Sequence, residues 1–384
     1  MGPIEEMRPE QLKDLERRIA ARRRELTESG GSWRSSLLWS VCALAAFFAL
    51  DGLVFHSGWY MAYLQPQSSA GQLESRIFWL RHEAEVPETA VLGDSRIGEG
   101  FSARAAQTAT GGAMRFRNIA VAGSTARVWY YLLRGADPER KRFPIVVLAM
   151  DRYSDQDGED QRDRMGDLNY VVGRLRLTDC PEFALSYHTE AFRWRALSGC
   201  LFRGIPLRED VQELLANPAE RFRVAKDWRN NGHGYLDGYG GKDEDLTGLT
   251  VDYAARTVQF PAGATQGQKD TVRNTLLPQP VPQTGMQREY RAKWLGKILD
   301  FYAGSKTRIV FIQMPRGPVP PPESKVPAYF VDSLKANPQV RVLTAETFRD
   351  LEQPELFADG LHLNHKGRPL FSERLAKKLM EPGQ

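Results

Sequence analysis

The 384-residue sequence has only three cysteines and six histidines, and its charges are nearly balanced. It contains neither a zinc-type cluster of cysteines nor a Walker-type phosphate loop, and no internal repeat is evident. The formal net charge of +4 at pH 7 is small for this length and gives no case for nucleic-acid binding. We therefore expect no metal, no other cofactor and no nucleic-acid partner.

One long apolar run departs from an otherwise soluble pattern. It extends from Leu37 to Phe55, roughly the length needed to cross the hydrocarbon core of a bilayer. Its only charge, Asp51, lies near the distal end, and no Lys or Arg follows until Arg76. The residues flanking the run include aromatics typical of membrane interfaces: Trp39, Trp59 and Tyr60. Several arginines precede it: Arg17, Arg18, Arg22, Arg23, Arg24 and Arg34.

The one-sided arginines favour a single-pass signal anchor in the inner (plasma) membrane. By the positive-inside rule the N-terminus is then cytoplasmic, and the chain after Phe55 lies in the periplasm or outside the cell. A cleaved signal peptide is one alternative, although some 36 residues precede the apolar core and only Ser68-Ser69-Ala70 resembles a cleavage site. A buried core helix is the other alternative.

Two of the cysteines, Cys180 and Cys200, are about 20 residues apart in one polar region. In an oxidising compartment they could form a disulfide, which fits an extracytoplasmic domain. Two unpaired thiols in a small core are the equal alternative.

Beyond the apolar run, short apolar stretches alternate with helical ones. Expected buried strands are Thr89–Leu92, Phe116–Val121, Ile145–Met150, Arg308–Met314 and Val340–Leu343. Expected helices are Pro9–Glu28, Thr125–Arg134, Met286–Tyr302, Ser324–Lys335 and Leu370–Met380. This alternation predicts an α/β domain with a parallel sheet covered by helices on both faces.

The expected division of the chain follows from these patterns. Residues 152–285 are rich in charge, Gly, Pro and Asn and form an insertion or cap between the third and fourth core strands. The expected segments are a charged cytoplasmic helix at 1–34, a transmembrane anchor at 35–56, a linker at 57–84 and the α/β domain at 85–384.

Two strings near opposite ends of the chain carry candidate chemistry. The string VLGDS at 91–95 follows a predicted strand, and the string DGLH at 359–362 lies near the C-terminus. Ligands bind beyond the carboxyl ends of strands in an open parallel sheet, which puts the Ser95 hydroxyl at the rim. Serine is a poor nucleophile without a base, so His362 is the candidate base and Asp359 its orienting carboxylate. The residue types predict acyl transfer through a covalent intermediate.

A tetrahedral intermediate also needs hydrogen-bond donors for its oxyanion. The backbone N–H groups of Ser95 and Gly123 are the best candidates, because Gly123 follows the second strand and lets a substrate approach the backbone closely. Gly123 ends a run that begins at Asn118, which is a further candidate for the oxyanion or substrate site.

These motifs resemble those of the SGNH (GDSL) hydrolase superfamily. Gly93-Asp94-Ser95 matches its nucleophile block, Asn118-x-x-x-x-Gly123 its second block and Asp359-x-x-His362 its last. The resemblance covers roughly residues 85–151 and 305–380, with the motifs in the family's order. It implies a three-layer flavodoxin-like fold and a Ser-His-Asp triad.

The third block departs from the family, which usually supplies an Asn side chain after the third strand. This chain has Asp151 there, and an ionised carboxylate cannot donate a hydrogen bond. A divergent third block also occurs in membrane-anchored members that assist alginate O-acetylation or teichoic acid D-alanylation. The resemblance therefore implies a polysaccharide acceptor and, as a partner, a membrane-bound O-acyltransferase.

Simpler interpretations stand beside each candidate. Ser95 could cap a helix, and Asp359 with His362 could form a local turn. Arg96 could contact an anionic substrate or make a surface salt bridge, and Asn364 and His365 are assigned to a loop rather than a metal site. Residues that could line a glycan groove, or equally a structural loop, are His233, Tyr235 and Tyr239.

The expected function is O-acyl transfer on a cell-envelope or secreted polysaccharide, with Ser95 as the nucleophile. A membrane-tethered carbohydrate esterase is the first alternative. An inactive scaffold or glycan-binding subunit with the same fold is the second.

Overall fold

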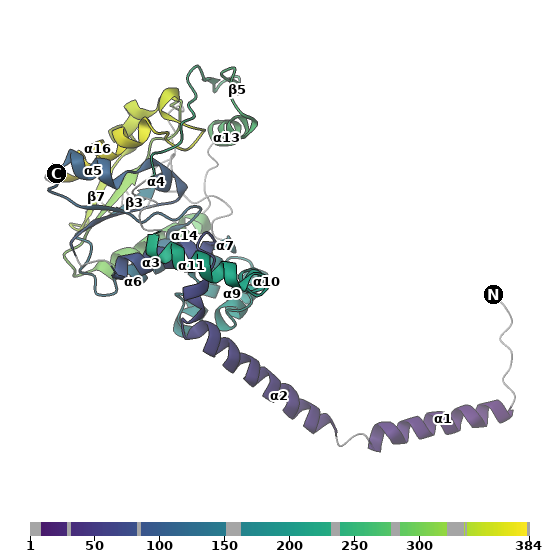
Figure 1. Ribbon diagram of the computed structural model, residues 1–384. Coiled ribbons are helices and arrows are strands. Elements are labelled where there is room, and N and C mark those ends of the chain that lie inside the picture. Colours follow the sequence, from purple (N-terminus) through teal and green to yellow (C-terminus); the bar gives the residue numbers. More distant parts are fainter. Residues whose placement is uncertain are drawn as a thin grey trace. The chain divides into compact units, whose positions relative to one another are not determined.

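The computed structural model describes residues 9–28, 32–82, 86–150, 163–231, 239–277, 285–320, 334 and 336–381. The chain forms two compact units, Met1–Ser57 and Gly58–Gln384, which are described separately below (Figure 1). The larger unit is a mixed α/β domain and contains both strings that carry the candidate chemistry.

A five-stranded sheet, parallel throughout, lies at the centre of the larger unit. Its strand order is β2-β1-β3-β6-β7. Apolar residues, many of them β-branched, fill the central strands because both faces of such a sheet are buried. The strands are β1 (Thr89–Leu92), β2 (Phe116–Asn118), β3 (Ile145–Met150), β6 (Arg308–Gln313) and β7 (Val340–Leu343).

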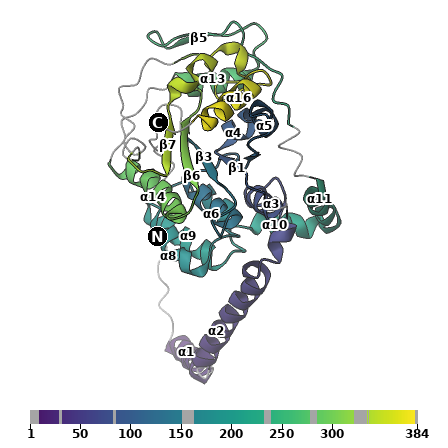
Figure 2. The ribbon, with the colours of Figure 1, turned by 90° about the vertical axis from the view of Figure 1, so that its left-hand side faces the viewer.

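Helices cover both faces of the sheet (Figures 1 and 2). Alternate strand residues pack against one helical layer or the other. Leu92 and Leu148 belong to one core, with α3 (Ser69–His82), α6 (Ala126–Ala136) and α14 (Gly285–Tyr302). Val91 and Val147 belong to the opposite core, with α4 (Ser95–Gly100), α5 (Ala103–Ala109) and α16 (Gly367–Met380). The predicted α/β sheet with helices on both faces is confirmed.

The segment between β3 and β6 is largely helical and contributes to both cores. Leu168 and Phe183 pack in the α6 core, and Val272 packs in the α16 core. Its elements are α7 (Gly166–Val171), η4 (Leu177–Asp179), α8 (Cys180–Leu185), α9 (Glu190–Leu201), α10 (Arg208–Ala216), α11 (Pro218–Asn231), the antiparallel pair β4 (Thr250–Asp252) and β5 (Thr257–Gln259), and α13 (Gln266–Leu276).

The prediction of a linker at 57–84 is wrong. This segment holds η3 (Tyr60–Tyr63) and α3, whose Leu73 and Ile77 are fully buried. The sequence does not show an amphipathic helix here, because charged residues lie on the buried side of α3 together with the apolar ones. One of them, Glu74, forms an ion pair with Arg174, which belongs to the insertion. Glu74 and Arg76 are therefore buried charged residues of α3, whereas Arg81 at its end is exposed.

Cys180 and Cys200 are both buried and both free. The Cys180 thiol donates to the Arg176 carbonyl at 3.5 Å. The structure therefore shows the alternative of two unpaired thiols in a core.

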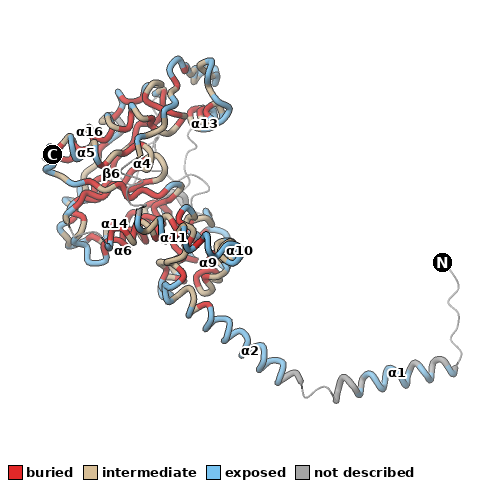
Figure 3. Tube along the Cα trace, in the orientation of Figure 1, coloured by how far each residue is buried: buried red, intermediate tan, exposed pale blue. Residues whose placement is uncertain are grey.

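The smaller unit consists of α1 (Pro9–Glu28) and α2 (Ser32–Asp51), which continues into the π-helical turn η2 (Gly52–His56). Within it, Ser35–His56 forms a helix of 22 residues with a mean hydropathy of 2.1, long and apolar enough to cross a membrane. Only 6% of its most apolar stretch of 18 residues is buried, and residues 35–50 are exposed (Figure 3). This exposure favours an anchor over the alternative of a buried core helix.

Candidate active site

Ser95 is placed by the turn that joins β1 to α4. Gly93 follows the strand, and a Cβ there would lie 2.7 Å from Ile97 Cγ1 and 3.0 Å from Ala149 Cβ, so this position requires glycine. Asp94 caps α4, its side chain accepting a hydrogen bond from the Arg96 backbone N–H at 2.9 Å. Ser95 is the first residue of α4, where its own N–H has no acceptor within the helix.

His362 lies in a tight loop that follows η6 (Pro354–Leu356) and precedes α16. Asp359 shapes this loop by accepting hydrogen bonds from the backbone N–H groups of Leu361 and His362, at 2.8 and 2.9 Å. The Ala358 N–H closes the loop by donating to the His362 carbonyl at 2.9 Å. Asp359 therefore fixes the backbone that carries the imidazole, as aspartate often does in turns.

The two strings meet in space although they are 267 residues apart. Ser95 Oγ lies 2.9 Å from His362 Nε2. On the other side of the ring, His362 Nδ1 lies 2.9 Å from Asp359 Oδ2 and 3.0 Å from Oδ1. This is the geometry of a nucleophile, a general base and an orienting carboxylate.

Asp359 is ionised over nearly the whole pH range. Its burial raises the pKa, but the hydrogen bond and charge of His362 and the two backbone N–H donors outweigh burial and bring the pKa to about 2. An ionised Asp359 holds the proton of the neutral imidazole on Nδ1 and leaves Nε2 to accept the Ser95 proton.

Lys242 is a neighbour of the triad that sequence reasoning missed. Its Nζ lies 2.9 Å from Glu99 Oε2 on α4 and 3.7 Å from Asp359 Oδ2. Lys242 therefore links the helix that begins at Ser95 to the loop that carries His362.

The segment 239–246, which carries Lys242, is held against the His362 loop mainly through backbone groups. The Lys242 carbonyl accepts from the His365 N–H at 2.9 Å, and the Leu246 N–H donates to the Pro354 carbonyl at 3.1 Å. Asn364 Nδ2 donates to the Glu244 carbonyl at 3.2 Å. Contacts between backbone groups impose almost no pattern on the residue types, which explains why no motif pointed to this segment.

Gly123 lies in a turn that is fixed beside the nucleophile loop. Val121 N–H and Ser124 Oγ donate to the Gly93 carbonyl at 3.1 and 3.2 Å. Gly123 has a φ of +68°, and a Cβ there would lie 3.1 Å from the Tyr170 hydroxyl and 3.2 Å from Arg164 Nη2. Arg164 is thus a further cation beside this turn, and the sequence did not single it out.

Asn118 has a different role from the predicted contact with an oxyanion or substrate. Its side chain is 2% exposed, and Nδ2 donates to the carbonyls of Ile97, Gly98 and Phe101 at 3.1, 3.3 and 3.0 Å. Its Oδ1 accepts from the Ala120 N–H at 3.1 Å. The amide nitrogen holds the end of α4 beside β2, and the amide oxygen binds the chain just after β2. Asn118 therefore positions α4, the helix that begins at Ser95.

The other predicted site residues are distributed as follows. Arg96 forms an ion pair with Asp94, and the distance from Nη2 to Oδ2 is 3.2 Å. This is the salt bridge that was considered for Arg96 beside a contact with an anionic substrate. Tyr239 stacks under Arg368, whose guanidinium carbon lies 4.8 Å from the ring centre, as expected of a structural loop. Asp151, His233 and Tyr235 lie outside the described residues.

Within the described ranges, no group of three or more His, Cys, Asp or Glu side chains could hold a metal ion. No protein-family model and no curated protein sequence matches this chain. The function proposed below therefore rests on the geometry of Ser95, His362 and Asp359.

Proposed function

We propose that this chain is a membrane-anchored member of the SGNH hydrolase superfamily that transfers O-acyl groups to a cell-envelope or secreted polysaccharide. The observation that carries the proposal is the hydrogen-bonded series Ser95–His362–Asp359, with 2.9 Å at each of its two links. A helix cap or a local turn accounts for one residue at a time, but neither accounts for the Ser95–His362 contact.

In the proposed reaction, Ser95 Oγ attacks the carbonyl carbon of an acyl donor while His362 Nε2 takes the hydroxyl proton. The negative charge on the carbonyl oxygen is stabilised by the N–H groups of Ser95 and Gly123. The donor's alcohol leaves with the proton from His362, and an acyl-serine remains. A sugar hydroxyl then loses its proton to His362 and attacks the acyl-serine, which returns Ser95 to its starting state.

The arrangement of the sheet supports the superfamily assignment. Counted in chain order, the five parallel strands have the order 2-1-3-4-5, which is that of flavodoxin-like sheets. The candidate nucleophile follows the first strand, at the point where the strand order reverses between β1 and β3. Open α/β sheets bind their ligands at such switch points.

The apolar helix supports an anchored protein. Arginines precede the helix, and no Lys or Arg follows it until Arg76, so the positive-inside rule puts the N-terminus in the cytoplasm and the triad outside it. Polysaccharides are abundant acceptors there, whereas activated acyl groups come from the cytoplasm. A membrane-bound O-acyltransferase is therefore the proposed partner that supplies the acyl group.

The same triad suits a carbohydrate esterase, because water can replace the sugar hydroxyl in the second step. The two activities are distinguished by adding an acetylated donor with and without an oligosaccharide acceptor. A transferase releases acetylated oligosaccharide faster than free acetate, whereas an esterase releases acetate at the same rate in both cases.

The test of the triad is hydrolysis of a chromogenic acetyl ester by the full-length protein in detergent, together with mass detection of acetyl-Ser95. We expect Ser95→Ala and His362→Ala each to lower kcat by about 10³-fold or more, and Ser95→Ala to abolish the acetylated species. Ser102→Ala is the matched control, because Ser102 caps the next helix and lies outside the triad. Turnover that survives Ser95→Ala would overturn the proposal. Absence of turnover by the wild type, with glycan binding that Ser95→Ala leaves unchanged, supports the inactive scaffold.

A further inference from the structure

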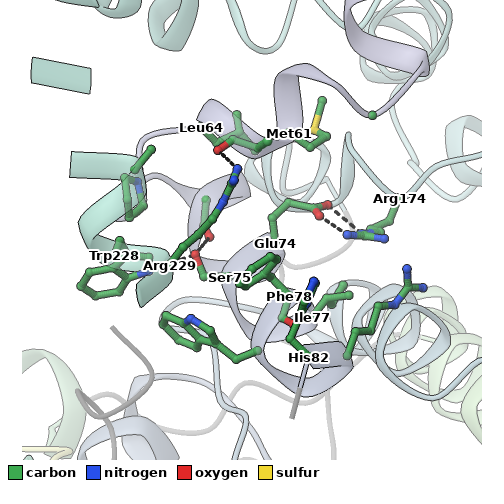
Figure 4. Close-up of a pocket in the computed structure, with 17 residues that line it drawn as sticks. Met61, Leu64, Glu74, Ser75, Ile77, Phe78, His82, Arg174, Trp228 and Arg229 are labelled. Carbon is green, nitrogen blue, oxygen red and sulfur yellow. Dashed lines mark hydrogen bonds and ion pairs between the residues drawn. The ribbon is translucent and has the colours of Figure 1, made fainter. Parts of the chain in front are cut away.

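A cavity lies in the larger unit, and none of the triad residues lines it. It has a volume of about 270 Å³ and is formed by η3, α3, α11 and Arg174 (Figure 4). Its volume falls just below the roughly 300–1,000 Å³ of pockets that enclose whole small-molecule ligands. The cavity therefore suits a head group better than a large ligand.

The apolar part of the lining is aromatic. The rings of Trp79 and Trp228 are 5.6 Å apart, and Phe78 stacks on His82 at 4.0 Å. Met61 and Leu64 contribute further apolar surface on the opposite side of the view in Figure 4. Such a surface accommodates methylene groups or a glycerol backbone.

The charged part of the lining is mainly cationic. The lining contains three arginines, Arg81, Arg174 and Arg229, and one carboxylate, Glu74. Both carboxylate oxygens of Glu74 bind the Arg174 guanidinium. Arg81 Nε donates to the Gly135 carbonyl at 3.0 Å, and no carboxylate pairs with Arg81 within the ranges that the structure describes.

The third arginine is held in a similar way. Arg229 donates to the Ala62 carbonyl and lies 5.4 Å over the Phe78 ring. No ion pair joins it to a carboxylate among the described residues. Burial and the neighbouring Arg174 lower the pKa of Arg81, and a bound anion relieves such a clustering of cations.

The lining of this cavity begins, along the chain, directly after the apolar helix. Gly58 lines the cavity and is two residues beyond His56, where the candidate membrane span ends. Next to Gly58, Trp59 exposes 58% of its surface, as expected of an aromatic residue at a membrane interface.

We propose that this cavity binds the phosphate of an anionic membrane phospholipid, with Arg81 and Arg229 on the phosphate and Phe78, Trp79 and Trp228 against the glycerol and first methylene groups. Arginine suits phosphate because its N–H donors match the phosphate oxygens in pairs. The site lies outside the triad, so the proposal does not depend on the acyl-transfer activity.

The test uses full-length protein in a non-ionic detergent and isothermal titration with dihexanoyl-phosphatidylglycerol. We expect saturable binding that Arg81→Gln and Arg229→Gln each weaken at least tenfold. Arg223→Gln is the matched control, because Arg223 lies on the same helix, is exposed and pairs with Glu220. Thermal unfolding of each variant confirms that it is folded. Arg81→Lys keeps the charge but loses the paired N–H donors, so we expect it to weaken binding less than Arg81→Gln does.

Inorganic phosphate and dihexanoyl-phosphatidylcholine separate the possible sources of the phosphate. We expect inorganic phosphate to bind at least tenfold more weakly than the anionic lipid, because it does not contact the aromatic residues. Equal binding of inorganic phosphate identifies a free-phosphate site and overturns the lipid assignment. Two other results also overturn it. One is that the two Gln variants bind the anionic lipid as tightly as the wild type and Arg223→Gln do. The other is that the zwitterionic lipid binds as tightly as the anionic one.

Discussion

Asp359 is the residue whose protonation most directly affects the loop that carries His362. Its carboxylate accepts two backbone N–H groups and the imidazole N–H, and this holds its pKa near 2. Because the pKa in the folded protein lies below the ordinary value of about 3.9, Asp359 stabilises the fold above about pH 4. This contribution is lost as the pH falls towards 2.

We expect Asp359→Asn to lower the free energy of unfolding by about 2 kcal/mol between pH 5 and 7 and to have little effect near pH 2. Urea unfolding of both proteins across this pH range measures the difference. A difference that is constant with pH would show that the carboxylate charge contributes nothing. The same substitution should lower kcat by about 10²- to 10⁴-fold, because Asn no longer fixes the imidazole tautomer.

The sequence singles out Asn118 as a contact for the oxyanion or substrate, whereas in the structure its side chain holds the end of α4. Replacing it by Ala removes two N–H donors, which are shared among three carbonyls at the end of α4, and the acceptor of the Ala120 N–H. We expect Asn118→Ala to lower the free energy of unfolding by about 3 kcal/mol, measured by urea unfolding, at about 1 kcal/mol for each of these three lost bonds. Asn274→Ala, at an exposed position on α13, should change it by less than about 0.5 kcal/mol.

Substitution of Lys242 tests whether its link between α4 and the His362 loop matters for turnover. Lys242→Met removes the cation that contacts both Glu99 and Asp359. We expect kcat for the acetyl ester to fall roughly three- to tenfold with little change in KM, because Lys242 holds the acid–base loop rather than the substrate. Lys242→Arg should restore most of the rate. Lys366→Met is the control, since Lys366 pairs with Asp245 instead, and an equal loss in that variant counts against a specific link.

At the scale of elements, the central strands are the part of the fold that the sequence predicts best. The observed bounds of β1, β3 and β7 are those expected, because buried parallel strands are short apolar runs ended by turn residues. Strand β2 ends at Asn118 rather than at Val121. The Ile119 and Val121 N–H groups still donate to carbonyls on the β1 side, so the predicted run continues beside β1 after the regular strand ends. The Asn118 side chain takes the Ala120 N–H, a local hydrogen bond that periodicity does not reveal.

The elements that escaped prediction are those held by non-local polar contacts. Helix α3 was missed because its charged residues are buried and paired across the domain. The segment 239–246 was missed because backbone carbonyls make its main contacts. The expected helix at 324–335 lies, apart from Leu334, outside the described residues.

Gly241 provides a test of how this segment is seated. It has a φ of +101°, and a Cβ there would lie 2.8 Å from His365 Cα and 2.9 Å from its backbone nitrogen. We expect Gly241→Ala to lower the free energy of unfolding by about 2 kcal/mol and to reduce ester turnover, because the segment must move away from the His362 loop. Gly240→Ala meets no atom within 4 Å and is the matched control. Equal effects of the two variants would show that the close approach is unimportant.

At the scale of the whole molecule, the chain combines an exposed apolar helix with a packed α/β domain. The arginine distribution predicts that the domain lies outside the cytoplasm. Alkaline phosphatase is active only after export, so we expect a fusion at the C-terminus to be active and a fusion ending at Ser32 to be inactive. The opposite result would invert the proposed topology and place the triad in the cytoplasm.

The distance along the chain between Ser95 and His362 has a consequence for when activity can arise. The helix that begins at Ser95 is held by residues close to the C-terminus: Arg368 donates to the Glu99 carbonyl at 2.8 Å, and Ser372 accepts from the Ser102 N–H at 2.8 Å. A nascent or truncated chain that ends before His362 has neither the candidate base nor these supports, and one that lacks only α16 (Gly367–Met380) loses the supports. In the proposed reaction, Ser95 therefore gains its base only after the chain has been synthesised almost to its end, so an unfinished chain holds an unactivated serine.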